Sequence, residues 1–81
     1  MFTVYILYSR SLDRFYVGFT NDLERRLSEH NRKKGKYTDY GMPWEVIHTE
    51  LFQTKEKAKA RESFIKKKKS KTYILELLNS R

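Results

Sequence analysis

Hydrophobic and polar residues follow one another in short blocks that predict strands at the start of the chain. The run 2–8 is aromatic, aliphatic and β-branched without glycine or proline, which predicts a strand covered on both faces. A polar, turn-like segment at 9–14 precedes a second short strand at 15–19, so the two are expected to form a β-hairpin. With the hairpin centred on that turn, Tyr5 and Tyr16 are expected across from each other on one face.

The remaining blocks predict three helices and one further strand. Asn21 and Glu24 have the spacing of a capping box, so a helix is expected to begin at Thr20 or Asn21 and to end at Gly35. A polar loop and Pro43 lead to a third strand at 44–52. A second helix is expected over 55–69, capped by Thr54, and a last amphipathic helix from Ser70. The order β-β-α-β-α-α predicts an α+β fold, with a three-stranded antiparallel sheet flanked by helices in a single domain over residues 1–81.

Composition narrows the class of protein. With 81 residues, 38% of them hydrophobic, the chain suits one compact core and excludes a multi-domain enzyme with a large enclosed pocket. The absence of cysteine excludes a disulfide framework and a cysteine-ligated zinc site. No apolar run approaches the roughly 18 residues of a membrane span, and no secretory leader follows Met1. A cytoplasmic protein without a membrane partner is therefore expected.

The positive charge is concentrated in the last third of the chain. The formal net charge is +8, and residues 53–81 hold ten basic and three acidic side chains against eight and seven in residues 1–52. Such a cluster favours a nucleic acid as the partner, although it is also typical of a solvated lysine face. The candidate nucleic-acid-binding residues are Lys66, Lys67, Lys68, Lys69 and Lys71.

Three charged or titratable side chains fall on predicted buried helix faces. At about 100° per residue, Arg26 and His30 lie beside the stripe of Leu23 and Leu27, either as functional groups or as a snorkelling arginine and a satisfied half-buried histidine. Glu62 shares the face of the apolar residues around it, so it either binds a metal or pairs with Lys66 one turn later. His48 is expected to face solvent and receives no role.

Together these residues resemble the GIY-YIG nuclease superfamily, in particular its small single-domain bacterial members. The two half-motifs are Thr3-Val4-Tyr5 and Tyr16-Val17-Gly18, and their tyrosines are eleven positions apart. Arg26 and His30 follow at the family's spacing, and Glu62 matches the family's metal-binding glutamate.

The resemblance implies an endonuclease that hydrolyses phosphodiester bonds by water attack, with one divalent ion, Mg²⁺ or Mn²⁺, as cofactor. In this scheme Glu62 would hold the metal and Arg26 would brace the phosphate. A tyrosine would activate the water, and the choice between Tyr5 and Tyr16 stays open, as does a proton relay through His30. The five side chains are expected to converge on one face of the sheet around one solvent-open pocket. The expected substrate is DNA rather than RNA, with branched or damaged DNA as candidates and DNA repair as the setting.

Departures from the family pattern keep two other functions open. Thr3 stands where the name-giving glycine belongs, Phe19 follows Gly18 where several catalytic members have a polar or basic residue, and the family's late asparagine has no assigned counterpart. The same fold could then serve as a non-catalytic, basic nucleic-acid-binding module. It could also serve as an interaction subunit that binds a protein partner through the last helix, marked by an exposed apolar patch.

Overall fold

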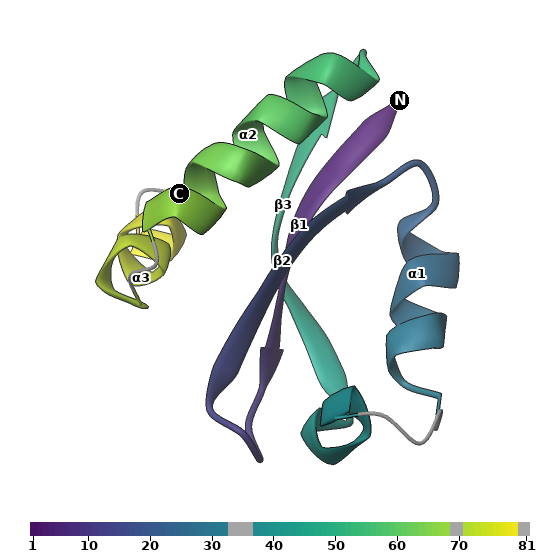
Figure 1. Cartoon of the computed structure of the whole chain (residues 1–81), viewed down its shortest axis with the longest axis vertical. Coiled ribbons are helices and arrows are strands. Elements are labelled where there is room, and N and C mark those ends of the chain that lie inside the picture. Colours follow the sequence, from purple (N-terminus) through teal and green to yellow (C-terminus); the bar gives the residue numbers. More distant parts are fainter. Residues whose placement is uncertain (33–36, 69–70, 80–81) are drawn as a thin grey trace.

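The computed structural model describes residues 1–32, 37–68 and 71–79, which form a three-stranded antiparallel sheet with helices on both faces (Figure 1). The strands are β1 (Phe2–Ser9), β2 (Arg14–Thr20) and β3 (Trp44–Phe52), in the spatial order β2-β1-β3. The helices are α1 (Leu23–His30), α2 (Lys55–Lys68) and α3 (Lys71–Asn79), with a short 3-10 helix at Tyr37–Gly41. The predicted element order and sheet are confirmed.

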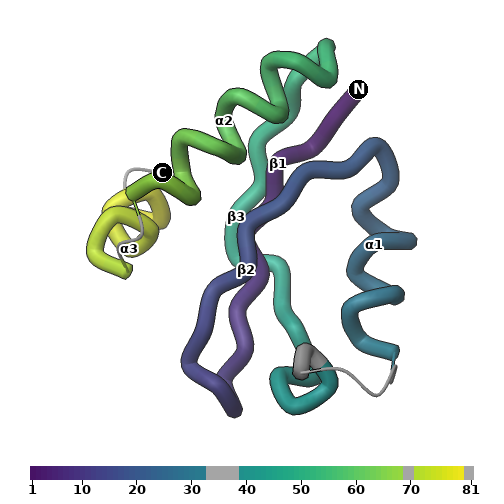
Figure 2. The backbone as a smooth tube through the Cα atoms, viewed as in Figure 1, coloured from purple at the N-terminus to yellow at the C-terminus, as the bar shows by residue number. Residues whose placement is uncertain are grey.

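The sheet separates two hydrophobic cores. Successive residues of β1 point to opposite faces, as the period of a strand requires. In Figure 2, α1 lies on one side of the sheet while α2 and α3 lie on the other. The face towards α2 and α3 buries Val4, Ile6, Val17, Ala58, Ile65 and Ile74. The face towards α1 buries Tyr5, Leu7 and Trp44, against which Leu23 and Leu27 of α1 pack. Burial on both faces confirms the prediction for the first strand.

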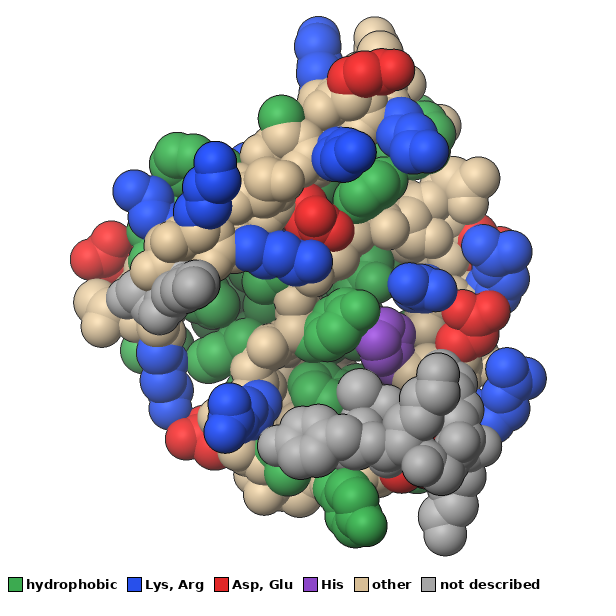
Figure 3. Space-filling view, viewed as in Figure 1, with side chains coloured by type: hydrophobic (Ala, Val, Ile, Leu, Met, Phe, Trp, Pro, Cys, Tyr) green, Lys and Arg blue, Asp and Glu red, His purple; other side chains and the backbone are tan. Residues whose placement is uncertain are grey.

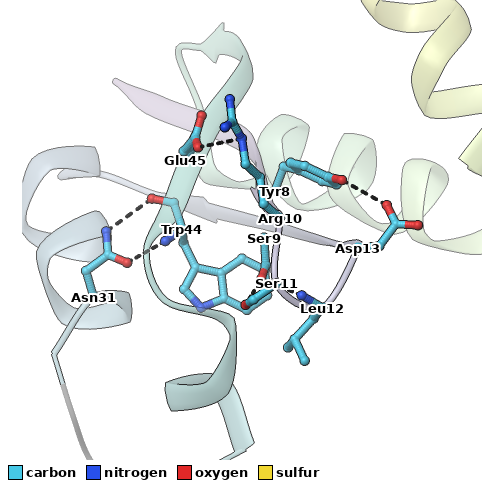
Figure 4. A network of polar contacts seen from close by, with 9 residues as sticks. All are labelled: Tyr8, Ser9, Arg10, Ser11, Leu12, Asp13, Asn31, Trp44 and Glu45. Atoms are coloured by element: carbon cyan, nitrogen blue, oxygen red, sulfur yellow. Dashed lines mark hydrogen bonds and ion pairs between the residues drawn. The ribbon is translucent and has the colours of Figure 1, made fainter.

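The hairpin closes on the expected turn, but its register differs from the expected tyrosine pair. Ser9 pairs with Arg14, which places Tyr5 opposite Gly18 and Tyr16 opposite Leu7. The two tyrosines therefore share a face but are offset along the strands rather than directly across from each other. Asp13 in the turn has a φ of 50°, and its carboxylate accepts a hydrogen bond of 2.9 Å from the Tyr8 hydroxyl (Figure 4).

Helix α1 begins later and ends earlier than predicted. Its N-cap is Asp22, whose carboxylate accepts from the Arg25 N–H, so the expected cap at Thr20 or Asn21 is wrong. The helix ends at His30 rather than at Gly35, which lies outside the described residues. Asn31 ends the helix by binding β3: the Trp44 N–H donates to its Oδ1 at 2.6 Å, and its Nδ2 donates to the Trp44 carbonyl at 3.1 Å (Figure 4).

Strand β3 has the predicted bounds but contains a bulge that redirects His48. Ile6 pairs with His48 whereas the next residue, Leu7, pairs with Val46, so one extra residue is inserted in β3. A bulge shifts the inside–outside alternation of a strand. His48 consequently lies opposite Ile6, on the face of α2, and is only 7% exposed. The expectation of a solvent-facing histidine is wrong for this reason.

Helices α2 and α3 follow the predicted boundaries where they are described. The Lys57 N–H donates to the Thr54 hydroxyl at 3.3 Å, which confirms the expected cap of α2. The expected end of this helix at Lys69 and the start of the next at Ser70 lie outside the described residues. Among the helices in the described ranges, none is both long and apolar enough to cross a membrane.

A buried polar cluster joins β3 to α2 on the face opposite α1. Glu50 accepts two hydrogen bonds from Arg61, at 2.8 Å from Nε and 3.1 Å from Nη2, and lies 2.8 Å from Nε2 of His48. The Glu50 and Arg61 side chains are 23% and 27% exposed. The hydrogen bonds from Arg61 hold the pKa of Glu50 below its ordinary value, with a smaller contribution from His48, and outweigh the opposing effect of partial burial.

This lowered pKa predicts a pH-dependent contribution to stability. At neutral pH, Glu50→Gln is expected to lower the free energy of unfolding by about 2 kcal/mol, because Arg61 loses a charged partner. Since folding moves the Glu50 pKa below its ordinary value of 4.5, this stabilisation is present above that value and is lost as the pH falls through the folded-state pKa. Urea unfolding of both proteins should therefore converge in acid. A difference that persists unchanged down to about pH 2 would contradict the assignment.

Candidate active site

Helix α1 places Arg26 and His30 beside the sheet, as the helical projection predicted. Leu23 and Leu27 pack against the core that contains Tyr5, and this packing sets the rotation of the helix. His30 is 8% exposed and lies within that face, whereas the Arg26 side chain borders it and remains 44% exposed. An arginine at the edge of a buried stripe can keep its guanidinium available to a ligand from solvent.

Tyr5 is buried, its ring lies over Gly18, and its hydroxyl accepts a hydrogen bond from Arg26. A Cβ atom on Gly18 would lie 2.5 Å from the Tyr5 hydroxyl oxygen and 2.8 Å from the ring carbon that carries it, so the ring occupies the space of the missing side chain. Arg26 Nε donates to the Tyr5 hydroxyl at 3.4 Å. Burial raises the pKa of Tyr5, while the hydrogen bond and the charge of Arg26 act in the opposite direction. Tyr5 thus joins the hairpin to Arg26 of α1.

Tyr16 and His30 form the neighbouring part of the same cluster. The two rings meet edge to face with centroids 4.6 Å apart, and the Tyr5 and His30 centroids are 6.4 Å apart. Trp44 of β3 lies 6.3 Å from the rings of both Tyr16 and His30. Edge-to-face contacts at these distances are favourable, so the aromatic rings hold one another in place. Four of the five predicted site residues therefore gather on the α1 face.

Glu62 lies on the other side of the sheet from this cluster. Its helix, α2, packs through Ala58 and Ile65 on the opposite core, so the expectation that all five residues lie on one face is wrong. The Glu62 side chain is 16% exposed, and its Oε2 lies 3.6 Å from Nζ of Lys66. Its charge is close enough to contribute to the raised pKa of Tyr5. The strand between the two layers at this point is β2, which is an edge strand.

An open groove of about 480 Å³ runs along β2 between this strand and helices α2 and α3. Its lining combines an apolar floor with a charged rim, and Tyr16 is the one of the five candidates that contributes to it. The expected single pocket around both phenols and the carboxylate is therefore wrong, because Tyr5 is buried beneath the surface. The lining residues are Asp13, Arg14, Phe15, Tyr16, Val17, Ile65, Lys66, Lys71 and Ile74.

Basic side chains lie along α2 beside this groove, as Figure 3 shows. Lys66 lines the groove, whereas Lys67 is exposed and projects about 180° from Ala58. Lys68 packs its ammonium 4.9 Å from the centre of the Phe64 ring. Lys71 pairs with both carboxylate oxygens of Asp13 at 3.0 Å. The fifth candidate, Lys69, lies outside the described residues.

A divalent ion at this site would depend on Glu62. Among the described residues, no group of three or more His, Cys, Asp and Glu side chains is arranged to hold a metal. Mg²⁺, however, is commonly bound through one or two carboxylates, with water and substrate phosphate oxygens completing its shell. The largely buried Glu62 side chain, whose carboxylate makes a 3.6 Å ion pair with a half-exposed lysine, suits this type of coordination.

The cluster that sequence reasoning missed is the set of His48, Glu50 and Arg61 on the opposite face. Arg61 directly precedes Glu62 in α2, and Glu50 lies two residues after His48 in β3. The available signal was only the opposite charge of Glu50 and Arg61. Their pairing depends on contacts between segments eleven residues apart, which no local pattern reveals.

The fold agrees with a comparison against known families. The GIY-YIG catalytic domain matches residues 1–74, and the chain belongs to the GIY-YIG family, which is a nuclease family. Its nucleases are generally dependent on a divalent metal.

The relatives found are UPF0213 proteins. Those of Streptococcus pyogenes serotypes M5 (strain Manfredo) and M3 (strain ATCC BAA-595 / MGAS315) are each 43% identical over 61 residues, which is 74% of this chain. The chain matches 66% of the length of these relatives. The solution NMR structure of the UPF0213 protein BH0048 from Bacillus halodurans has a TM-score of 0.62 and 32% identity, and the match covers 100% of this chain and 86% of that chain.

The contact between Gly18 and Tyr5 predicts that Gly18→Ala displaces the tyrosine ring. We expect a loss of about 1–3 kcal/mol in the free energy of unfolding, because the added methyl group overpacks a buried site. Urea unfolding monitored by circular dichroism measures this loss. In a Tyr5→Phe background the loss should be smaller, since the oxygen that the new Cβ would approach to 2.5 Å is gone. Equal losses in both backgrounds would refute the proposed clash.

Proposed function

We propose that this protein is a divalent-metal-dependent endonuclease that hydrolyses phosphodiester bonds of DNA. The observation that best supports this function is the meeting of a guanidinium, two phenols and an imidazole from β1, β2 and α1, which are remote in sequence. In this proposal the carboxylate of Glu62 completes the set from α2, on the other face of the sheet. Such a mixed set beside a basic groove suits a phosphate-cleaving site better than a site that only binds a polyanion.

In this proposal Glu62 holds the metal. The bound metal would polarise the scissile phosphate and stabilise the departing oxygen. The Glu62 side chain is 16% exposed, which leaves it partly accessible to a ligand from solvent. Lys66 would exchange its contact with Glu62 for a phosphate oxygen when substrate is present.

Arg26 braces the phosphate in the proposed site. Its Nε is used by the Tyr5 hydroxyl at 3.4 Å, and its Nη1 lies 3.3 Å from Glu29. The side chain is 44% exposed, so other N–H groups of the guanidinium can face solvent. A guanidinium held in this way is prepared to donate charge-assisted hydrogen bonds as negative charge grows on the phosphate.

Of the two tyrosines, we assign to Tyr16 the activation of the attacking water. Tyr16 lines the open groove, whereas Tyr5 is 1% exposed and burial raises its pKa. A buried phenol with a raised pKa stays protonated at neutral pH and cannot take up the proton of the water, so Tyr5 is better suited to orient Arg26. His30, whose ring contacts that of Tyr16 edge to face, is the proposed relay for the proton.

The substrate class in this proposal is DNA, with branched or damaged DNA as the candidates. The cations of α2 and the groove would contact phosphates and position the strand without reading bases. Nicking of supercoiled plasmid, compared with forked and four-way DNA and with RNA, distinguishes these substrates.

The first test of this function is the loss of cleavage on Glu62→Gln. In Mg²⁺ or Mn²⁺ we expect the wild-type protein to nick plasmid DNA and the variant to be slower by about a hundredfold or more, since it cannot hold the metal. Binding of DNA in metal-free buffer should be unchanged. Glu56→Gln, at an exposed position of the same helix, serves as the matched control and should nick normally.

The salt dependence of DNA binding tests the role of Lys66. Each phosphate neutralised on double-stranded DNA contributes about −0.9 to the slope of log affinity against log salt. Lys66→Met should therefore reduce the steepness by about 1. Lys67→Met, which projects away from the sheet, should change the slope less. The two slopes, measured by fluorescence anisotropy over a salt series, would be equal if the lysines act only as a diffuse positive surface.

A non-catalytic nucleic-acid-binding module is the second candidate. The Lys66 contact favours it, because an ammonium beside Glu62 already neutralises the carboxylate that a metal would need. Salt-sensitive DNA binding by the wild-type protein without nicking in either metal ion would support this candidate against the first.

An interaction subunit is the third candidate. Leu75 of α3 is 45% exposed, and it lines a small apolar groove together with Tyr8, Phe15, Ile47 and Leu78. Absence of both DNA binding and nicking would favour this function.

A further inference from the structure

We infer that the ion pair between Arg61 and Glu50 fixes the rotation of α2 about its axis and thereby positions Glu62. Arg61 is in this view a positioning residue, which acts on the opposite side of the helix from the proposed metal ligand. The inference rests on the proposed function, because it concerns the placement of Glu62 for that reaction.

Helical geometry places Arg61 and Glu62 on opposite sides of the line where α2 touches the sheet. Ala58 and Ile65 are 0% and 2% exposed and mark that line. At about 100° per residue, Arg61 lies about 60° to one side of Ala58 and Glu62 about 40° to the other. Arg61 thus leans towards β3, where it binds Glu50. Glu62 leans to the side of Lys66, which lines the groove with β2.

The contact of α2 with β3 has a defined direction, because Arg61 binds Glu50 at two points. Arg61 makes a two-point contact with the Glu50 carboxylate, at 2.8 Å and 3.1 Å, and both side chains are less than one-third exposed. His48 lies 2.8 Å from the same carboxylate, which ties it to β3. The Nη1 of Arg61 also reaches the Tyr73 hydroxyl of α3 at 3.5 Å. A paired fork geometry of this kind fixes orientation as well as distance.

No contact described on the Glu62 side of α2 can replace this restraint. The ion pair of Glu62 is with Lys66, one turn later on the same helix, so it turns with the helix and cannot oppose a rotation. The apolar contacts beneath the helix, through Ala58 and Ile65, set which face meets the sheet, but Ala58 is a small side chain with little relief. The ion pair with Glu50 restricts the rotation that this packing leaves.

A small roll would matter for the proposed reaction. With a helix radius of about 5–6 Å including side chains, a rotation of about 20° moves a side chain on its surface by about 2 Å. Misplacement of a catalytic group by about 1 Å can reduce a rate about a hundredfold. Loss of the ion pair can thus reduce cleavage while the protein stays folded and DNA binding is retained.

The test compares Arg61→Lys and Arg61→Met with Thr54→Ala. Arg61→Lys keeps the charge but not the two-point contact, and Thr54→Ala removes the cap of the same helix without touching the ion pair. We expect kcat for nicking to fall about tenfold in Arg61→Lys and further in Arg61→Met, with DNA affinity unchanged. Thr54→Ala should keep the wild-type kcat at a temperature where all the variants are folded.

A second readout follows the metal without relying on catalysis. Mn²⁺ broadens NMR signals of nearby nuclei, so in the wild-type protein without DNA the amide signals of Tyr16 and Gly18 should broaden, and Glu62→Gln should abolish the effect. In Arg61→Met the pattern of broadening over β2 should shift. An unchanged pattern with wild-type kcat, or an equal loss of kcat in Thr54→Ala, would overturn the positioning role. If the wild-type protein shows no broadening, the proposed metal site itself is wrong and this inference fails with it.

Discussion

The central strand β1 is the constraint on which the rest of the structure depends. It is hydrogen-bonded to a neighbour on each side, and its residues Val4 to Leu7 are between 0% and 1% exposed. Because alternate side chains of a strand point to opposite faces, this single segment fixes which residues enter each core. Tyr5 is thereby held on the α1 face, and its ring can lie over Gly18 only because that residue of the neighbouring strand lacks a side chain.

The residues of the proposed site come from both layers on the sheet rather than from one face. Helix α1 supplies Arg26 and His30 from one layer, and α2 supplies Glu62 from the other. An edge strand leaves room for ligands to reach both layers, whereas the centre of the sheet is closed by side chains. Two cations of the last third of the chain, Lys66 and Lys71, line the groove along this edge, which places electrostatic attraction next to the proposed chemistry.

The polar cluster of His48, Glu50 and Arg61 restrains the orientation of α2 on the sheet. A buried or half-buried ion pair adds little net stability unless its hydrogen bonds are well satisfied, and its main value is often geometric. Here the carboxylate of Glu50 is shared by Arg61 and His48, and the bulge in β3 is what brings His48 to it. The placement of a proposed catalytic carboxylate therefore depends on a backbone irregularity on the opposite side of the helix.

Local patterns determined most of the secondary structure, since the period of apolar residues and the caps act within a few positions. The bounds of β3, the Thr54 cap and the order of elements follow from such signals. The orientation of Arg26 and His30 also followed from periodicity, because a helix has one fixed angle per residue.

Tertiary structure decided what depends on pairing between distant segments. The offset of Tyr5 and Tyr16 depends on the hairpin register, and the burial of His48 depends on a bulge relative to β1. The early end of α1 reflects the binding of Asn31 to the backbone of Trp44, thirteen residues away. Sequence alone could name the five candidate residues. The position of Glu62 in the opposite layer depends on the packing of two helices on the two faces of one sheet.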